Sequence, residues 1–376
     1  MLDFTSACYL GLRHPHASLA PWDRLTPGVP AALAEPCSAK AVAGRLAGLV
    51  GTEHAVLATS TLHAFWDLFL TLGVDRLSCY VDAAAYPIAR WGAERAAARG
   101  MPVEQFPHHG AGALRELLAA RRPAGRRPVV VTDGLCPGCG QPAPLRQYLR
   151  TLRPLGGLVV VDDTQALGIL GRYPGPSRPY GRGGGGSLRL ARLNSPDVLV
   201  VSSLAKAFGV PVAVIAGSGS LIGRYERRSE TRVHCSPPSF AHLRAAEHAL
   251  EVNRLQGDQR RAWLAALVRR LQAGVRGIGP VTGPVGFPVQ SLEPVVGVSP
   301  AVLHQRLLHL GVRTVLHRPA CRAVTTCSFL ITAEHTPEQI DRAIAALDRA
   351  ISGPARTAGT PRWRVPGAAL PAGDHS

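Results

Sequence analysis

Short apolar runs alternate with segments of helical periodicity through the middle of the chain. Three of the runs, residues 127–132, 157–162 and 198–202, are continuous apolar stretches rather than alternating ones. Continuous β-branched runs are typical of strands that are covered on both faces of a sheet. Strands interleaved with helices predict an α/β fold with a mostly parallel central sheet. Further strand-like segments are 55–57, 79–81 and 212–216, and further helix-like segments are 88–99 and 145–155.

The pattern changes toward both ends of the chain. Residues 1–45 are rich in Pro, Gly and Ala and predict irregular structure until a helix begins near Ser38. The region from residue 353 is Pro- and Gly-rich without periodicity, which predicts a disordered tail. Between these regions a smaller α/β unit is expected, with helices at 240–255, 259–274 and 337–351 and strands at 311–316 and 329–332.

A Gly- and Pro-rich stretch at residues 171–187 interrupts the large α/β region. It is too long to be an ordinary connection between a strand and a helix. We expect it to form part of an active-site rim rather than a plain linker.

Charge adds a second kind of information. The 376 residues include 42 Lys+Arg against 25 Asp+Glu, a formal net charge of +17. The basic residues are spread along the chain, and no nucleic-acid-binding motif accompanies them, so we expect no nucleic-acid partner. Lysine accounts for only two of the 42 basic residues. Chemistry that needs an amine must therefore use Lys206, Lys40 or the N-terminus.

The cysteines and the apolar segments bear on the compartment. Eight cysteines are scattered without a disulfide framework, and Cys136-Pro-Gly-Cys139 is one C-x-x-C pair without a second. A single pair is a weak signal for zinc or redox chemistry. The first residues lack the pattern of a secretory signal, and no apolar run reaches about 18 residues. We expect a cytoplasmic protein with no membrane partner.

The strongest candidate for chemistry is Lys206, in the segment Val200-Val-Ser-Ser-Leu-Ala-Lys-Ala-Phe-Gly209. A lysine just after a buried parallel strand lies where open α/β sheets bind ligands. Partial burial there would lower its pKa toward that of a usable nucleophile. The alternative is a surface lysine that buries only its stem.

A second candidate is Asp162, in Val159-Val-Val-Asp-Asp-Thr-Gln165. An acidic residue at the end of an apolar strand could hold a protonated heterocyclic nitrogen. On its own, Asp-Asp after a strand is more often a helix cap or a metal ligand.

Four motifs in this order resemble a known family: DFTSACYLGL, TDGLCPGCGQPAPL, VVDDTQALGILG and VSSLAKAFG. They are similar to pyridoxal-phosphate (PLP) enzymes of the class I/II aminotransferase fold, closest to the α-oxoamine synthase group. That group includes 8-amino-7-oxononanoate synthase and 2-amino-3-ketobutyrate CoA ligase. The resemblance runs from about residue 3 to about residue 351. It implies PLP fold type I, the aspartate-aminotransferase-like fold, and a homodimer.

The resemblance also implies a division of the chain. Residues 1–45 would join the small domain, 46–240 would form the large PLP-binding domain, 241–352 the small C-terminal domain, and 353–376 the disordered tail.

Matched position by position, the family's motifs assign roles to individual residues. Lys206 would form the Schiff base with PLP and shuttle a proton, and Asp162 would pair with the pyridine nitrogen. Ser203 would bind the phosphate, together with Ser60 and Thr61 at the start of a helix. The resemblance further assigns ring stacking to Tyr86, contact with the ring oxygen to Gln165, and contact with a neighbouring subunit's phosphate to Ser236.

Several positions depart from the family's pattern. Tyr86 and Gln165 stand where the family has histidines, and Pro137 and Cys139 stand where it usually has a serine and an acidic residue. Asp133 keeps an acid nearby, although a helix cap or an ion pair would explain it equally well. The arginine that clamps a substrate carboxylate is missing, and Arg318 and Arg322 are the nearest substitutes. The histidines 108 and 109 are interpreted as a solvated loop pair near the site rim.

The expected function is a PLP-dependent transferase that condenses an amino acid with an acyl thioester through a Cα carbanion. The basic surface would suit CoA or another anionic acyl carrier. One alternative is an aminotransferase or a Cα–Cβ lyase acting on an unusual amino acid. Another is a degenerate PLP-fold module that binds without catalysis.

Overall fold

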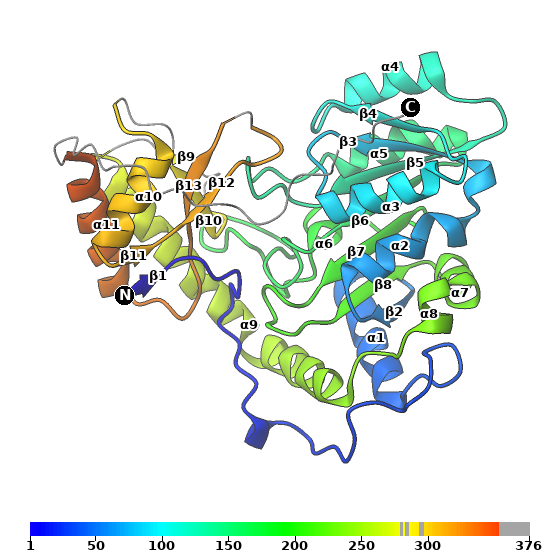
Figure 1. The fold of residues 1–376 in the computed structure, drawn as a ribbon, viewed down its shortest axis with the longest axis horizontal. Coiled ribbons are helices and arrows are strands. Elements are labelled where there is room, and N and C mark those ends of the chain that lie inside the picture. The colour runs from blue at the N-terminus through cyan, green and yellow to red at the C-terminus, as the bar shows by residue number, and fades with distance from the viewer. Residues whose placement is uncertain (279–280, 283–285, 293–296, 323, 353–376) are drawn as a thin grey trace, which may run out of the picture.

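Seven strands form the central sheet, in the order β2-β8-β7-β6-β5-β3-β4. The computed structural model describes residues 1–278, 281–282, 286–292, 297–322 and 324–352. Strand β8 runs antiparallel to both of its neighbours, and the other pairs are parallel. The predicted α/β fold with a mostly parallel central sheet is therefore confirmed (Figure 1). The strands are β2 (His54–Ala58), β3 (Leu77–Asp82), β4 (Val103–Phe106), β5 (Arg127–Asp133), β6 (Leu158–Asp162), β7 (Val198–Ser203) and β8 (Ala213–Gly217).

Helices cover both faces of this sheet. Two separate apolar clusters form, one on each face, because the side chains of a strand alternate between the two faces. One face carries α2 (Thr61–Leu72), α3 (Pro87–Ala97) and α7 (Gly219–Arg228), and the other carries α1 (Cys37–Val50), α5 (Leu145–Leu152) and α9 (Phe240–Val275). Three shorter or peripheral helices are α4 (Ala111–Arg121), α6 (Ser187–Leu190) and α8 (Glu230–His234).

A second, smaller unit follows the long helix α9 (Figure 1). It has an antiparallel sheet in the order β12-β13-β10-β9, with the helix α10 packed against it. Its elements are β9 (Val281–Thr282), β10 (Val289–Leu292), α10 (Pro300–His309), β11 (Val312–Arg313), β12 (Val315–His317), β13 (Thr326–Leu330) and α11 (Pro337–Ser352).

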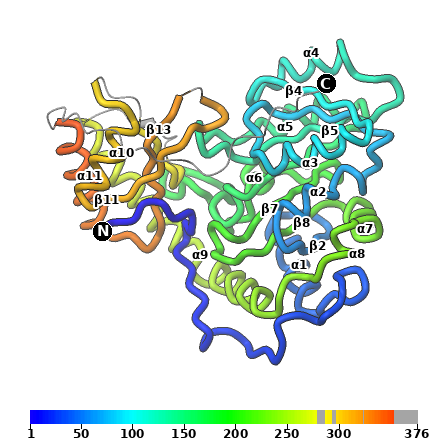
Figure 2. The backbone as a smooth tube through the Cα atoms, in the orientation of Figure 1, coloured from blue at the N-terminus to red at the C-terminus, as the bar shows by residue number. Residues whose placement is uncertain are grey.

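The first residues of the chain lie in this smaller unit. Strand β1 (Leu2–Asp3) pairs in parallel with β11, with Leu2 opposite Val312. Phe4 is fully buried and stacks on His335 at 4.4 Å between ring centroids. The start of the chain therefore lies beside residues more than 300 positions away (Figure 2).

One sequence-based expectation about this region was wrong. Helix α9 is one continuous helix of 36 residues rather than two, because Gly257 does not interrupt it. A Cβ at Gly257 would lie 2.4 Å from Oδ1 of Asn253 and 2.8 Å from Arg261, so the glycine gives these side chains room. Arg261 is 2% exposed and donates to the carbonyl of Gly168 and to Asn253, each at 2.8 Å.

The Gly- and Pro-rich stretch 171–187 packs on α9, and its place on an active-site rim stays a prediction. The Asn253 side chain donates to the Gly183 carbonyl at 3.0 Å, and the Gly183 N–H donates to Asp258 at 2.9 Å. Within this stretch the backbone at Gly171 lies so close to the backbone at Arg182 that only glycine fits there. A Cβ at Gly171 would lie 1.9 Å from the Arg182 carbonyl oxygen.

The predicted disordered tail, residues 353–376, lies outside the described residues. Among the helices that the structure describes, none combines the length and apolar character needed to cross a membrane.

Candidate active site

A tight turn after β7 holds Lys206. The Leu204 N–H donates to Val212 at 2.8 Å and the Val210 N–H donates to Leu204 at 3.1 Å, which closes the turn. Gly209 has a φ of +67°, a left-handed conformation that glycine adopts without strain. Lys206 is partly buried, whereas the chain's other lysine, Lys40, is exposed on α1.

Two carboxyl groups face the same pocket from the ends of adjacent strands. Asp162 ends β6 and Asp133 ends β5, and the two residues are register partners in the parallel pair. Both are buried, with 5% and 9% of their surface exposed. Asp162 accepts a hydrogen bond from the Thr164 N–H at 3.1 Å, and Asp133 accepts one from the Tyr86 N–H at 3.0 Å. Parallel strands thus bring together acids that lie far apart in the sequence.

Burial and mutual repulsion set the charges of these groups. Burial lowers the pKa of Lys206, against the opposing attraction of Asp162 and Asp133. Burial raises the pKa of Asp162, and burial together with the neighbouring Asp162 raises the pKa of Asp133 well above its usual value. One amine and two carboxyl groups that are buried together favour protonation states in which they share protons. A cationic ligand atom beside Asp162 would reduce the free-energy cost of burying its charge.

Tyr86 caps this arrangement on the solvent side. Its ring is about half exposed, and the Lys206 Nζ lies 5.8 Å from the ring centroid. Tyr86 precedes Pro87, the first residue of α3, and its own N–H is held by Asp133. An exposed ring that is fixed through its backbone offers a flat surface for stacking.

The N-terminus of α2 opens into the same pocket. Thr61 is the first residue of α2 and lines the pocket, and Ser60 is the N-cap residue. The Ser60 hydroxyl accepts from the His63 N–H at 3.3 Å and lies 2.8 Å from the His63 ring nitrogen. A helix N-terminus attracts anions through its free N–H groups and its dipole.

Two further groups complete the polar wall. Ser203 accepts a hydrogen bond from the Ala205 N–H at 3.1 Å, and its own N–H donates to the Thr164 hydroxyl at 3.0 Å. Gln165 accepts from the hydroxyl of Tyr9 at 2.8 Å, so the first motif of the chain reaches this site. Thr164 and Tyr9 were not predicted from the sequence, although both lie inside the motifs that carry the resemblance.

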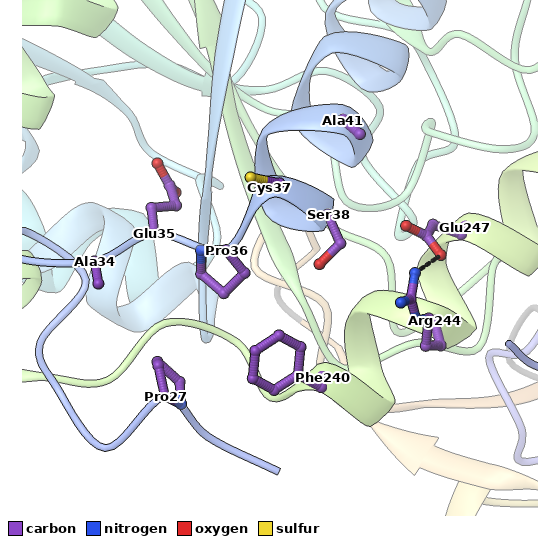
Figure 3. A pocket seen from close by; sticks show the side chains of 10 residues that line it. All are labelled: Pro27, Ala34, Glu35, Pro36, Cys37, Ser38, Ala41, Phe240, Arg244 and Glu247. Atoms are coloured by element: carbon purple, nitrogen blue, oxygen red, sulfur yellow. Dashed lines mark hydrogen bonds and ion pairs between the residues drawn. The ribbon is translucent and has the colours of Figure 1, made fainter. Parts of the chain in front are cut away.

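The pocket has a volume of about 170 Å³. Six of the predicted residues line it, Lys206 among them, together with Asp133, Thr164 and Pro137, which had no assigned role. A larger hollow of about 610 Å³ lies between the N-terminal segment, α1 and the start of α9 (Figure 3). Its charged groups include Arg244 and Glu247, which pair at 2.9 Å, and it contains neither lysine. The residues around Lys206 are Thr61, Tyr86, Ile88, Asp133, Pro137, Asp162, Thr164, Gln165, Ser203 and Ala205.

Four predicted residues do not line this pocket: Ser60, Ser236, Arg318 and Arg322. Ser60 is the N-cap residue next to Thr61, which does line it. Ser236 lies in a separate small hollow beside His63 and Arg232. Arg318 is exposed and Arg322 is partly buried, both in the segment that follows β12. The described part of the chain therefore places no arginine among the residues that line the Lys206 pocket.

Comparisons with known proteins place this chain in a family. Residues 36–347 match the model of the family "Aminotransferase class I and II". The 8-amino-7-oxononanoate synthase of Alkalilimnicola ehrlichii is 32% identical over 257 residues, which cover 67% of this chain and 62% of the relative. The chain thus spans less than two thirds of the length of this curated relative.

Solved structures agree on the fold. A serine palmitoyltransferase with PLP as an internal aldimine superposes with a TM-score of 0.80 at 18% identity, over 93% of this chain and 86% of that one. The 8-amino-7-oxononanoate synthase of Francisella tularensis gives a TM-score of 0.73 at 16% identity, over 93% and 97%. The predicted resemblance to the α-oxoamine synthase group is confirmed, and so is fold type I. The chain belongs to the family of class I and II aminotransferases.

Proposed function

We propose that this protein is a PLP-dependent transferase that condenses an amino acid with an acyl thioester. The observation that carries the proposal is the meeting of Lys206, Asp162 and the N-terminus of α2 in one pocket. Lysine scarcity supports it, because the other lysine lies exposed on α1.

The residues of the pocket suit each part of PLP. The aldehyde needs an amine, and Lys206 is an amine whose pKa is lowered by burial. The phosphate needs N–H donors and hydroxyls, which Thr61, Ser203 and the α2 N-terminus supply. The ring needs a flat partner and an anion at its nitrogen, and Tyr86 and Asp162 can fill these roles.

Bound PLP supplies an electron sink that stabilises a carbanion at the Cα of an amino acid. Lys206 is the group that can take up and return the Cα proton, since its lowered pKa leaves more of the amine neutral. Asp162 would hold positive charge at the ring nitrogen of bound PLP, and the Thr164 N–H fixes the Asp162 carboxylate. Gln165, fixed by Tyr9, can donate its amide N–H to an oxygen atom but cannot titrate.

The choice of reaction is supported by the relatives rather than by the pocket. Their names, 8-amino-7-oxononanoate synthase and serine palmitoyltransferase, denote enzymes that join an amino acid to an acyl group. An anionic carrier such as CoA fits a chain of net charge +17. We also propose that the protein is cytoplasmic, which is consistent with its eight free cysteines. We further propose that it is a homodimer, and we expect light scattering to give twice the mass of one chain.

The first test is a near-visible absorbance titration of the purified protein with PLP. We expect the wild type and the control Lys40→Ala to develop the band of a lysine-bound cofactor. Lys206→Ala should keep the spectrum of free PLP, because its reactive amine is gone. A wild type without the band would contradict the proposal and would favour a degenerate binding module.

The second test separates the reaction types. The protein is incubated with a panel of acyl-CoA thioesters and amino acids, and the release of free CoA is measured by chromatography. We expect this release to require both the thioester and the amino acid. Transfer of the amino group to a keto acid without thioester would favour the aminotransferase alternative. Cleavage of a β-hydroxy amino acid without either co-substrate would favour a lyase.

A further inference from the structure

Four metal-binding side chains meet at the edge of the Lys206 pocket. His108 follows β4, Cys136 and Cys139 belong to the loop after β5, and Cys321 follows β12 of the smaller unit. One ligand atom from each residue lies within 4.8 Å of those of the other three. The His108 Nε2 lies 3.4 Å from the Cys139 sulfur. Tetrahedral zinc with bonds of about 2.0–2.3 Å places its ligand atoms roughly 3.5–3.8 Å apart, so only small side-chain adjustments are needed.

The loop between the two cysteines is already shaped for a shared ligand. The Gly140 N–H donates to the Cys136 carbonyl at 2.6 Å, which closes a tight turn, and Gly140 has a φ of +61°. Gly138 admits no side chain, since a Cβ there would lie 2.5 Å from the Cys321 sulfur and 2.6 Å from Pro319. The turn that carries Cys136 and Cys139 therefore lies directly against the Cys321 sulfur.

The histidine is held in the tautomer that a metal needs. His108 Nδ1 lies 2.8 Å from Asp82 Oδ1, so a proton on Nδ1 leaves the lone pair on Nε2 facing Cys139. Asp82 is 1% exposed and also accepts from the N–H groups of Ala84 and His109 at 2.9 and 3.0 Å. A carboxylate behind a histidine is the usual outer support of a zinc ligand. The prediction of a solvated histidine pair was therefore wrong for His108.

We propose that His108, Cys136, Cys139 and Cys321 bind one Zn²⁺ ion in a closed tetrahedral site. Each of the three thiols gives up its proton to solvent and binds as a thiolate, and the neutral imidazole binds through Nε2. Three sulfurs and one imidazole nitrogen are a set that zinc prefers, and they leave no position for substrate. The ion is structural rather than catalytic.

The proposed zinc ligands lie between the Lys206 pocket and the smaller unit. Pro137 lies between two of the ligands and lines the Lys206 pocket. Cys321 comes from the smaller unit, close to Arg318 and Arg322 in the sequence. Zinc would therefore fix one wall of the pocket to the segment that carries both candidate arginines, and the proposal does not depend on which reaction the pocket performs.

The test is metal analysis of the full chain, purified without chelator and with reduced thiols. We expect about one zinc per chain in the wild type and in the control Cys37→Ser, which changes an exposed cysteine on α1. Cys139→Ser and Cys321→Ser should lose at least tenfold in zinc affinity. Asp82→Asn should keep the stoichiometry at saturating zinc while binding about 10- to 100-fold more weakly.

Cobalt provides a second readout that does not require each variant to be equally stable. The wild type with Co²⁺ in place of zinc should show the intense visible bands of a tetrahedral site with thiolate ligands. These bands lie toward the red, apart from the absorbance of lysine-bound PLP. They should be absent from Cys139→Ser and present in Cys37→Ser.

Three results would overturn the proposal. One is a folded, reduced wild type that takes up no stoichiometric zinc. Another is zinc bound equally by the wild type, Cys139→Ser and Cys321→Ser. The third is a metal-free protein whose mass is lower by two hydrogens and whose peptide map shows a disulfide between Cys136 and Cys139. None of these results bears on the PLP titration, so the two proposals can fail separately.

Discussion

Asp163 allows a quantitative prediction because it is a fully buried carboxyl group beside the proposed cofactor partner. Its oxygens accept from the Ser187 N–H at 3.0 and 3.3 Å. Two glycines lie against it, since a Cβ at Gly134 or Gly186 would come within 2.0 or 1.9 Å of a carboxyl oxygen. Burial, opposed in part by Ser187, raises the pKa of Asp163 from 3.8 to about 7.

The sign of the stability effect follows from this raised pKa. A group with a higher pKa in the folded state stabilises the fold fully below its unfolded pKa, and this contribution is lost as the pH rises through the folded pKa. For Asp163 the loss falls between about pH 4 and pH 7. At about 1.36 kcal/mol per pH unit, the shift of about 3 units sets a ceiling of about 4 kcal/mol. About 3 kcal/mol of that falls between pH 5 and pH 8, and relaxation with water entry lowers our expectation to about 2 kcal/mol.

The perturbation is Asp163→Asn, which keeps the shape and removes the titration. Thermal unfolding of the cofactor-free wild type and variant is measured at pH 5 and at pH 8. The difference in melting temperature, variant minus wild type, should be about 2 to 4 °C higher at pH 8. Titrating groups remote from Asp163 are shared by both proteins and cancel in this comparison.

A matched control separates burial from the simple loss of one negative charge. Asp75→Asn removes a carboxylate whose side chain is 75% exposed. The melting temperature of this variant minus that of the wild type should not rise in the same way between pH 5 and pH 8. An equal pH dependence in wild type and Asp163→Asn would refute the reasoning, because it would show that Asp163 titrates alike in the folded and unfolded chain.

Two further substitutions test the packing around the site by thermal unfolding. Arg261→Met should destabilise the fold by about 2–4 kcal/mol, since it leaves buried partners of the guanidinium unpaired; an unchanged melting temperature would show that apolar packing replaces the charge without cost. Gly92→Ala should destabilise by about 1–3 kcal/mol despite better helix propensity, because the new Cβ would lie 2.4 Å from the Phe65 carbonyl oxygen. Gly44→Ala is the control, at an exposed helix position with nothing within 4 Å, and should stabilise by about 0.5–1 kcal/mol. A loss of stability at Gly44 equal to that at Gly92 would contradict the steric explanation.

The sequence predicted the parts of the site that follow buried strands. Lys206 and Asp162 come directly after continuous apolar runs, and a parallel sheet brings the ends of such runs to one edge. Asp133 was predicted only as an acid of uncertain role, because its burial depends on its neighbours in space. The register of β5 against β6 places it beside Asp162, and the sequence does not specify that register.

Other features depend on distances between segments that are remote in the chain. Cys136 and Cys139 alone gave a weak metal signal, and the third sulfur lies on Cys321, in a different unit of the fold. The single helix α9 was predicted as two, because a glycine within a helical pattern normally weakens it. Packing around Gly257 decides the outcome here, and such packing is visible only in three dimensions.

The pairing of β1 with β11 has a consequence for biosynthesis on the ribosome. Leu2 meets its partner Val312 only after about 310 further residues have been made, which takes roughly 15–60 s at ~5–20 residues per second. During that interval Phe4 and Leu10, both fully buried in the finished protein, have no completed core to enter. The apolar segment around Phe4 therefore stays without its native partners during that interval, and the smaller unit cannot complete its fold before β11 has been made.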